Sequence, residues 1–414
     1  MSTEVMSGYK LTEVGLIPEE WEVKRLGECL ASTPRYGINA AAVPYSDRLP
    51  VYIRITDIST DGRFSPEKLV SVDNTQASNY YLLDGDIVLA RTGASVGKSY
   101  KYDTSDGPLV FAGFLILIRP NPTKLVSGYI SSYLSTKKYW DWVGLMSMRS
   151  GQPGINGKEY SQLPLPIPSI SEQREISITL FDIDYLIKNL DKIIAKKRDI
   201  QQAVMQQLLT GQRRLPGFSG EWEMKRLGDV GELISGGTPK TSNPEYWGGH
   251  IKWCTPTDIT RSKGKYLSET ERNISEAGLA DSGARLLPAG SLLICTRATI
   301  GELKIARTPL CTNQGFKSLI CHDDISQEFM YYKLLTMKKD MIERAFGSTF
   351  LEISKANISA ITFSVPPQAE QKAIATILSD MDTELAALEA RRDKARHIKQ
   401  GVMQELLTGR TRLI

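Results

Sequence analysis

One stretch of the chain, residues 171–211, reads SEQREISITLFDIDYLIKNLDKIIAKKRDIQQAVMQQLLTG, with no Gly or Pro before its last residue. Apolar residues recur along it at alternating steps of four and three, the a/d spacing of a coiled-coil seam. They are Ile176, Leu180, Ile183, Ile187, Leu190 and Ile194. At about 1.5 Å per residue, the sequence predicts a helical rod of about 60 Å with one apolar face. Such a rod needs a partner that covers this face.

The ends of this predicted helix carry start and stop signals. Ser169 and Glu172 have the S-x-x-E spacing of a capping box, in which each side chain binds the backbone N–H of the other residue. Gly211 follows two leucines and a threonine, at the place where helices commonly end in a left-handed glycine.

A second stretch, residues 370–409, supplies the partner and reads EQKAIATILSDMDTELAALEARRDKARHIKQGVMQELLTG. The closing phrases VMQQLLTG and VMQELLTG begin at Val204 and Val402, an offset of 198 residues. At this offset each seam position from Ile176 to Leu190 meets another apolar residue. The matching residues are Ile374, Leu378, Met381, Leu385 and Leu388. We therefore expect two copies of one long helix.

Polar residues interrupt the apolar face. Lys197 and Gln201 precede the return of the pattern at Val204 and Leu208. In an antiparallel pair, these residues face the part of the second helix between residues 374 and 388. Two interpretations stay open: the polar residues fix the register, as a buried polar residue does in coiled coils, or the seam opens there for a docking subunit.

Connectivity favours antiparallel pairing. The first helix lies between two globular segments, and the second helix follows the second segment. Parallel helices would require the ends of that segment to lie about 60 Å apart. We expect two globular parts on a pseudo-twofold frame.

The globular segments are also copies of each other. Trp21-Glu-Val-Lys-Arg-Leu-Gly27 recurs as Trp222-Glu-Met-Lys-Arg-Leu-Gly228, and Asp57-Ile58 recurs as Asp258-Ile259. Two further pairs follow at slightly different offsets, as small loop insertions produce. They are Ala94-Ser-Val-Gly97 with Ala298-Thr-Ile-Gly301, and Gly113-Phe114 with Gly315-Phe316.

Each globular segment has strand-like runs first and helical runs later, which predicts a compact α+β domain. The strand-like runs include residues 51–56, 86–91 and 292–296, and the helical runs cover residues 129–143 and 326–344. A proline-bearing edge segment, 163–169 or 363–368, precedes each long helix. The expected domains are 1–168 and 212–366, each followed by a long helix at 169–211 and 367–414.

Composition narrows the class of protein. The 414 residues are 41% hydrophobic and 24% charged, with a net charge of +4, which suits a globular chain and gives no nucleic-acid signal by itself. Five cysteines without a C-x-x-C pair and three scattered histidines predict no metal site. The first residues do not resemble a signal peptide, and the longest apolar run, 109–118, is shorter than the ~20 residues that span a bilayer. We expect a cytoplasmic protein.

One loop nearly matches a phosphate-binding P-loop. Gly93-Ala-Ser-Val-Gly97-Lys98-Ser99 has three residues between its glycines, whereas a P-loop has four. The second copy has Glu302 where Lys98 stands, so the repeated feature is the tight turn. An NTPase that uses Lys98 stays an alternative, which a Lys98→Ala variant tests.

Two other motifs have ordinary structural explanations. Asn243-Pro-Glu-Tyr246 resembles the N-P-P-Y tetrad of adenine methyltransferases but lacks a preceding glycine-rich motif, which favours a polar loop. Glu22-x-Lys24 has the spacing of some nuclease sites without an upstream Asp partner, which favours an entry strand beside Trp21. Since no Ser-His-Asp or Cys-His arrangement recurs in both halves, we predict a non-catalytic chain.

Basic and aromatic residues gather in the turn-rich parts of both globular segments, where recognition residues usually lie. Arg and Lys side chains contact phosphates or guanine edges in DNA complexes. The candidates for DNA binding are Tyr36, Arg54, Arg91, Lys98 and Lys101 in the first half and Lys240, Lys252, Arg261, Lys263 and Arg297 in the second. The competing explanation for each is a solvated surface charge.

The whole layout resembles the specificity (S) subunit of type I restriction-modification systems. The resemblance rests on the W-E-x-K-R-L-G openings, Gly236-Gly-Thr-Pro239, Tyr246-Trp-Gly-Gly249, the phrase PPQAEQ before the second helix and the VMQxLLTG endings. The first half lacks the G-G-T-P phrase and has Ser32-Thr-Pro-Arg35 near that place.

The resemblance implies that each globular segment is a target recognition domain that reads one half of a bipartite double-stranded DNA site. The helices would set the spacing and dock two modification (methyltransferase) subunits. It places S-adenosylmethionine, ATP and Mg on partner subunits, restriction (translocase/nuclease) subunits included, and no cofactor in this chain. The alternative is a structural adaptor of a protein complex without direct DNA readout, in which alanine at Arg54, Arg91 and Arg297 would leave DNA binding unchanged.

Overall fold

A computed structural model describes residues 7–148, 152–347 and 351–413. The chain divides into two compact units. Unit 1 comprises Met1–Asp191 and Arg391–Ile414, and unit 2 comprises Lys192–Ala390. Each unit therefore contains one half of each long helix, so that a complete unit needs two separate pieces of helix.

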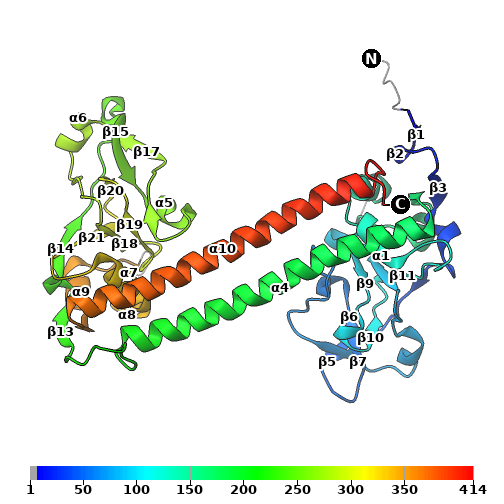
Figure 1. Cartoon of the computed structure of the whole chain (residues 1–414), viewed down its shortest axis with the longest axis horizontal. Coiled ribbons are helices and arrows are strands. Elements are labelled where there is room, and N and C mark those ends of the chain that lie inside the picture. The colour runs from blue at the N-terminus through cyan, green and yellow to red at the C-terminus, as the bar shows by residue number, and fades with distance from the viewer. Residues whose placement is uncertain (1–6, 149–151, 348–350, 414) are drawn as a thin grey trace. The chain divides into compact units, whose positions relative to one another are not determined.

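The two long helices are α4 (Ile170–Leu209) and α10 (Gln368–Leu406), drawn in green and in orange to red in Figure 1. The stretches with the apolar period, 171–211 and 370–409, match these helices to within three residues at each end, whereas α10 ends eight residues before the expected limit of 414. Gly211 and Gly409 follow them with φ of 74° and 70°, the left-handed conformation that glycine adopts freely. The N–H groups of Arg213 and Thr411 bond back to the carbonyls of Gln207 and Glu405 and complete equivalent helix ends.

The predicted antiparallel pairing is confirmed inside each unit. In unit 1, Lys399 Nζ lies 2.7 Å from Asp184 Oδ1, and Arg396 pairs with Asp191. In unit 2, Gln201 Nε2 donates to Asp382 Oδ1 at 2.6 Å, and Arg198 pairs with Glu389. Residue numbers rise along α4 as they fall along α10. The unit 1 contacts are the unit 2 contacts displaced by the 198-residue offset.

Most residues of the predicted seam lie out of solvent. Eight are buried, namely Ile176, Leu180, Ile187, Leu190, Ile194, Ile374, Leu378 and Leu385. Ile183, Met381 and Leu388 are half-buried. Lys197 and Gln201 face α10, as expected, because Lys197 Nζ pairs with Glu384 Oε1 at 2.7 Å. In unit 2, side chains of opposite charge or matching polarity thus bridge the interruption of the apolar stripe.

The described strands of unit 1 are short and form two four-stranded sheets and two two-stranded sheets. One sheet has the order β10-β6-β7-β5 and the other β4-β11-β8-β9, while β1 pairs with β2 and β12 with β3. The bounds are β1 Tyr9–Thr12, β2 Gly15–Pro18, β3 Glu22–Arg25, β4 Arg35–Tyr36, β5 Ala42–Pro44, β6 Val51–Ile53, β7 Val70–Val72, β8 Ile87–Ala90, β9 Ser99–Lys101, β10 Leu109–Phe111, β11 Leu115–Ile118 and β12 Pro164–Ile167.

The helical run expected at 129–143 in unit 1 is two helices, because the chain turns between residues 133 and 137. The α-helices are α1 Ser127–Tyr133, α2 Lys137–Met146 and α3 Gly157–Ser161, and the 3-10 turns are η1 Leu26–Cys29, η2 Ile55–Asp57, η3 Ala77–Tyr80, η4 Gly93–Ser95 and η5 Thr104–Asp106. Thr136 accepts a hydrogen bond from Tyr139 N and caps α2, which explains the new start.

Unit 2 has the sheets β14-β21-β18-β19-β16 and β17-β15-β20, with β13 paired to β22. The strands are β13 Glu223–Arg226, β14 Gly231–Ser235, β15 Trp247–Cys254, β16 Tyr266–Leu267, β17 Arg272–Ile274, β18 Leu292–Cys295, β19 Leu303–Ala306, β20 Cys311–Thr312, β21 Phe316–Cys321 and β22 Thr362–Val365. The helices are α5 Pro256–Arg261, α6 Glu276–Ala280, α7 Gln327–Thr336, α8 Lys338–Glu343 and α9 Lys355–Ser359, with turns η6 Leu227–Asp229 and η7 Pro244–Tyr246. The run expected at 326–344 is again two helices.

The predicted entry strands after Trp21 and Trp222 are present, and the proline-bearing segments pair with them: β12 with β3, and β22 with β13. Trp21 is 1% exposed, and its Nε1 donates to Glu172 Oε2 at 3.1 Å. Arg412 pairs with the same carboxylate at 2.6 Å. The expected capping box is therefore only half formed, because Ser169 Oγ accepts from Glu172 N while the glutamate side chain turns into the core.

Unit 2 repeats this buried cluster. Glu370 is fully buried and accepts from Trp222 Nε1 at 3.2 Å, and Arg214 Nε pairs with it at 2.7 Å. The next residues, Gln173 and Gln371, accept from Val126 N at the start of α1 and from Ser326 N at the start of α7. In both units, these consecutive glutamate and glutamine side chains thus join the long helix to the globular part. Among the helices that the structure describes, none is both long and apolar enough to cross a membrane.

Candidate nucleic-acid interface

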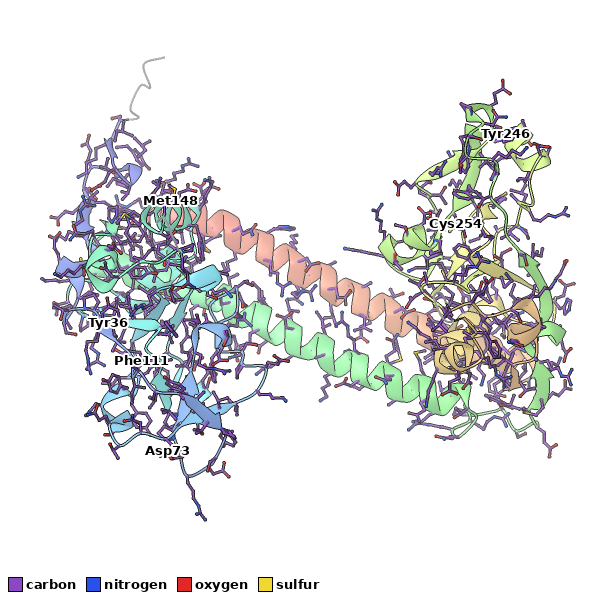
Figure 2. All side chains as sticks on the ribbon, turned by 180° about the vertical axis from the view of Figure 1, so that it is seen from behind. Tyr36, Asp73, Phe111, Met148, Tyr246 and Cys254 are labelled. Atoms are coloured by element: carbon purple, nitrogen blue, oxygen red, sulfur yellow. The ribbon has the colours of Figure 1, made fainter. Side chains whose placement is uncertain are left out.

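In unit 1, the structure brings together two of the predicted residues, Tyr36 and Arg91. Tyr36 lies on β4 and is 43% exposed, and its hydroxyl accepts from Gly157 N at 3.2 Å. The Arg91 guanidinium lies 4.9 Å from the centre of the Tyr36 ring, within cation–π range. The backbone of Arg91 is fixed on both sides, by bonds to Phe114 O and from Ile155 N. This edge therefore presents an arginine held on an aromatic ring (Figure 2 labels Tyr36).

The glycine-rich loop after β8 is a tight turn, as expected. Gly93 and Gly97 have φ of 71° and 88°, and Gly301 in unit 2 has φ of 82°. Tyr139 donates its hydroxyl proton to Gly97 O at 2.7 Å, so α2 holds the turn in place. The Lys98 amine donates to the backbone carbonyl of Ile58 at 3.2 Å. The turn thus fixes the end of β8 beside the Tyr36 edge.

Arg54 is engaged inside unit 1. Its Nε and Nη2 atoms donate to Asp57 at 2.9 and 2.8 Å, and Asp57 is 2% exposed. The carboxylate raises the pKa of Arg54 through this hydrogen bond. Asp258 occupies the matching place in unit 2, where it accepts from Thr255 N and Glu271 N. The repeated Asp-Ile pair is therefore a buried cap, and Arg54 neutralises one copy of it.

The remaining predicted residues are spread over several elements. Lys101 is half-buried on β9, whereas Lys240 and Lys263 are exposed. Lys252 pairs with Glu269 at 3.0 Å, and Arg261 pairs with Glu271 at 2.9 Å, which places both beside the loop before β17. Arg297 pairs with Glu352 at 2.8 Å on the turn after β18.

Sequence reasoning missed Arg272, which lies at the start of β17. Its guanidinium carbon is 3.6 Å from the centre of the Trp247 ring. Trp247 Nε1 donates to Lys240 O at 3.2 Å, so Arg272 is brought beside a predicted residue. The signal in the sequence was the Tyr-Trp-Gly-Gly phrase itself, whose glycines imply an irregular strand.

Sequence reasoning also missed Gly37, which stands where the first half lacks the G-G-T-P phrase. Its N–H donates to Leu115 O, and a Cβ at Gly37 would lie 2.2 Å from Ala112 O. Gly236 has the same constraint, with 2.1 Å to Asn313 O. The two glycines let β4 and β14 leave their sheets at equivalent points.

We expect Gly37→Ala to lower the free energy of unfolding by about 2 kcal/mol, because the methyl group meets backbone atoms that cannot move aside. Gly144→Ala is the control, since a Cβ there meets nothing within 4 Å. Urea unfolding of both variants, followed by circular dichroism, measures the difference. Equal stability of the two variants would contradict the assignment.

The Asn243–Tyr246 segment is a capped turn. Asn243 Oδ1 accepts from Glu245 N at 3.1 Å, and the Tyr246 hydroxyl donates to Asp281. Figure 2 marks Tyr246 at the end of unit 2 where β15 lies. These contacts fit the polar loop that the sequence predicts.

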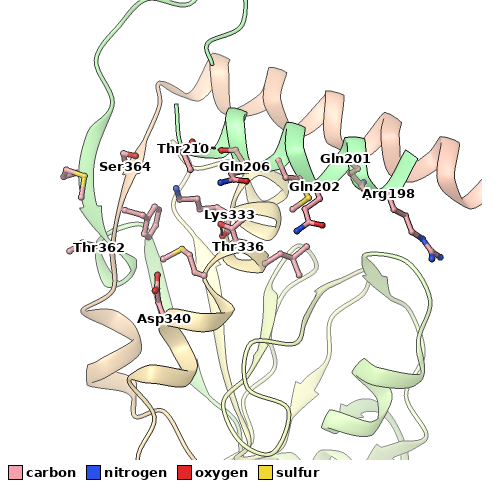
Figure 3. Close-up of a pocket in the computed structure, with 15 residues that line it drawn as sticks. Arg198, Gln201, Gln202, Gln206, Thr210, Lys333, Thr336, Asp340, Thr362 and Ser364 are labelled. Atoms are coloured by element: carbon pink, nitrogen blue, oxygen red, sulfur yellow. Dashed lines mark hydrogen bonds between the residues drawn. The ribbon is translucent and has the colours of Figure 1, made fainter. Parts of the chain in front are cut away.

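Unit 2 also has a groove between the second half of α4, the α7–α8 turn and strands β13 and β22 (Figure 3). Lys333 lies in it, 7% exposed, and donates to Leu209 O at 2.7 Å at the end of α4. Burial lowers the pKa of Lys333. In unit 1, the β1–β2 hairpin packs on the matching elements, since Tyr9 donates to Gly409 O and Lys138 to Val14 O.

The described residues include no group of three or more His, Cys, Asp or Glu side chains arranged to hold a metal ion. Two buried polar side-chain atoms, Thr299 Oγ1 and Ser318 Oγ, have no hydrogen-bond partner among those residues. Both belong to unit 2, Thr299 on the glycine turn and Ser318 on β21.

Comparison with protein families gives two matches along the chain. The model described as "Type I restriction modification DNA specificity domain" matches residues 18–196 and again 219–395. The two matches begin just before the Trp21 and Trp222 phrases and end within α4 and α10. They therefore correspond to the internal repeat.

Several curated relatives are named as specificity subunits of type I restriction enzymes. The specificity subunit of the type I restriction enzyme MjaIX of Methanocaldococcus jannaschii is 40% identical over 164 residues, which are 39% of this chain and 38% of that protein. The putative MjaX specificity subunit of the same organism is 25% identical over 423 residues, 98% of this chain and 97% of that protein. The EcoR124I/EcoR124II specificity subunit of Escherichia coli is 28% identical over 54% of this chain and 57% of that protein.

Solved structures share the fold. The S subunit of a type I restriction-modification system from M. genitalium matches with a TM-score of 0.62 and 14% identity, over 96% of this chain and 97% of that one. A chain from a structure of a type I restriction-modification complex matches with a TM-score of 0.58 and 19% identity, over 95% and 99%.

Proposed function

Because this chain belongs to the family of type I restriction-modification DNA specificity domains, we propose that it is the subunit that recognises DNA in such a system, with each unit reading one half of a bipartite duplex site. The proposal rests on one observation: the two copies of the repeat share their buried framework but differ in their exposed residues. Both units share the buried Glu–Trp–Arg cluster and the glycine turn, whereas their exposed basic and aromatic residues differ. A shared frame with unlike surfaces suits a target with two unlike halves.

The exposed surfaces support direct contact with DNA. Unit 1 presents Arg91 on Tyr36, and unit 2 presents Arg272 on Trp247 together with exposed Lys240. Guanidinium groups bind phosphate oxygens and guanine edges, and a ring that supports the guanidinium reduces the conformational freedom lost on binding. We also propose that the two predicted domains, residues 1–168 and 212–366, are the parts of the chain that contact DNA.

We further propose that the long helices dock two methyltransferase subunits. On α4 in unit 1, Ile178, Phe181 and Tyr185 are 53%, 64% and 59% exposed, and the last two rings stack at 6.4 Å. Exposed apolar side chains gathered on one face are typical of a protein interface. In this proposal the chain is non-catalytic, and S-adenosylmethionine, ATP and Mg bind to the methyltransferase and restriction subunits.

Methylation sequencing of the source genome with and without this gene tests the function. Loss of one bipartite methylation motif on deletion supports the proposal and identifies the target. An unchanged methylation pattern, in cells whose methyltransferase subunit is expressed, would refute it. The adaptor alternative predicts that alanine at Arg54, Arg91 and Arg297 leaves DNA binding unchanged but disrupts a protein complex.

Arg91→Ala tests the contact in unit 1. In the complex assembled with the modification subunits, we expect affinity for the bipartite duplex to fall about tenfold, since an arginine contact to a base or phosphate is removed. Fluorescence anisotropy at several salt concentrations measures it, because phosphate contacts set the salt slope. Arg63→Ala is the control, since Arg63 is half-exposed and paired with Asp61 at 3.0 Å. Equal affinities for the two variants would exclude Arg91 from the interface.

A further inference from the structure

Strand β15 contains an irregularity that its sequence requires. Trp247 and Ile251 both face Ile274 of β17, so the residues between them bulge out of the ladder. Gly248 has φ of 77°, and a Cβ at Gly249 would lie 2.5 Å from Ile274 O. Only glycine fits both positions, which explains the Trp-Gly-Gly phrase.

The bulge brings two tryptophans together. Six residues of regular strand would separate Trp247 and Trp253 by about 20 Å. Instead their ring centres are 5.0 Å apart at an angle of 84°. Both indole N–H groups are satisfied, since Trp253 donates to Gly237 O at 2.9 Å and Trp247 to Lys240 O at 3.2 Å. The tryptophan pair is thereby fixed to the Gly236–Lys240 loop.

Arg272 rests on this pair. It lies directly opposite Trp253 in the β15–β17 register, and its guanidinium carbon is 3.6 Å from the centre of the Trp247 ring and 5.4 Å from that of Trp253. The neighbouring cations Lys252 and Arg261 both pair with glutamates. No ion pair among the described residues involves Arg272. The Trp247 ring thus holds the guanidinium in place, while no ion pair among the described residues occupies its N–H groups.

The surroundings of Arg272 suit the major groove of DNA. Figure 1 shows β15 and β17 side by side with α6, at the end of unit 2 away from α10. Arg272 lies on β17, an edge strand of the three-stranded sheet β17-β15-β20. An arginine in the major groove binds the O6 and N7 atoms of guanine with two parallel hydrogen bonds. A guanidinium held against an indole ring loses less conformational freedom when it forms such a pair.

We infer that Arg272 reads a guanine in the half-site of unit 2, held for this purpose by the Trp247–Trp253 pair. The inference rests on the proposed function and specifies one base contact within it. The Gly236–Lys240 loop supports the same site through its carbonyls, and exposed Lys240 adds positive charge beside it.

The test uses the complex assembled with its modification subunits and the bipartite motif found by methylation sequencing. Competition binding with duplexes that carry every single-base change then gives a preference profile for wild type and variants. We expect Arg272→Ala to lose at least tenfold discrimination at one G·C pair in one half-site, with the other half unchanged. Arg272→Lys should also lose this discrimination, because lysine keeps the positive charge but cannot form two parallel hydrogen bonds with one base. Trp247→Leu should weaken the same position.

Arg307→Ala is the matched control, since Arg307 is exposed and lies 5.5 Å from the ring centre of Tyr266 in another sheet. Its preference profile should equal that of wild type. Equal weakening of Arg272→Ala on all duplexes with a shallower salt slope would identify a phosphate contact and overturn the inference. An unchanged profile would also overturn it, whether or not thermal unfolding shifts. Failure of the wild-type complex to prefer any bipartite duplex would refute the proposed function instead.

Discussion

Glu172→Ala is expected to lower the free energy of unfolding of unit 1 by about 3–5 kcal/mol, because it breaks a buried ion pair and removes a hydrogen-bond acceptor. The glutamate is 2% exposed and accepts from Trp21 Nε1 while it pairs with Arg412. Trp21, 1% exposed, would keep an indole N–H without a partner. Urea unfolding, with hydrogen exchange of peptides from residues 7–33 to locate the loss in unit 1, measures the effect.

Glu175→Ala controls for this substitution, since Glu175 is exposed on the next turn of α4. A surface change of this kind costs less than about 0.5 kcal/mol. Glu172→Gln should fall between the two, because the amide oxygen still accepts from Trp21 while the charge that pairs with Arg412 is gone. If Glu172→Ala is as stable as Glu175→Ala, the cluster does not join the helix to the globular part.

Leu180→Ala has the second large expected effect, a loss of about 3 kcal/mol of unfolding free energy. Leu180 is 1% exposed and belongs to the same buried cluster as Ile176, Tyr129 and Leu406. The substitution therefore opens a cavity where α4, α10 and the globular part of unit 1 meet. Denaturant unfolding followed at 222 nm measures the loss.

The neighbouring residue provides the contrast. Phe181 is 64% exposed on the same turn, so Phe181→Ala should change stability by less than about 0.5 kcal/mol. A loss for Phe181→Ala as large as that for Leu180→Ala would mean that the buried face of α4 is assigned wrongly.

The long helices could be predicted from the sequence because their signals are local and repeated. A period of 3.5 residues, a left-handed glycine and the absence of internal proline act within a few turns, and duplication in α10 provides an independent second copy. The side-chain contacts at the start of α4 could not be predicted in the same way. The spacing of Ser169 and Glu172 predicts a reciprocal cap, but Glu172 bonds instead to Trp21 and Arg412, which are distant in sequence.

The candidate interface was harder to predict because exposure and pairing depend on tertiary contacts. Arg54 and Arg91 look alike in the sequence, yet Arg54 is bound to buried Asp57 while Arg91 lies on Tyr36. Arg272 escaped notice because its position depends on a bulge that places Trp247 and Trp253 together. Charge alone identifies a basic residue, whereas its partners decide whether it can bind a ligand.

The division of the chain into units has a consequence for its biosynthesis. Unit 2 is one continuous segment, Lys192–Ala390, whereas unit 1 needs Arg391–Ile414 in addition to the beginning of the chain. Leu406 and Leu407 complete the core of unit 1, and Arg412 neutralises Glu172. During synthesis, the core of unit 1 therefore cannot close until the residues after Ala390 have been made, whereas unit 2 can close once Ala390 has been made. Until then the apolar face of the first half of α4 lacks the α10 residues that cover it, so we expect exposed apolar surface to make aggregation easiest in this interval.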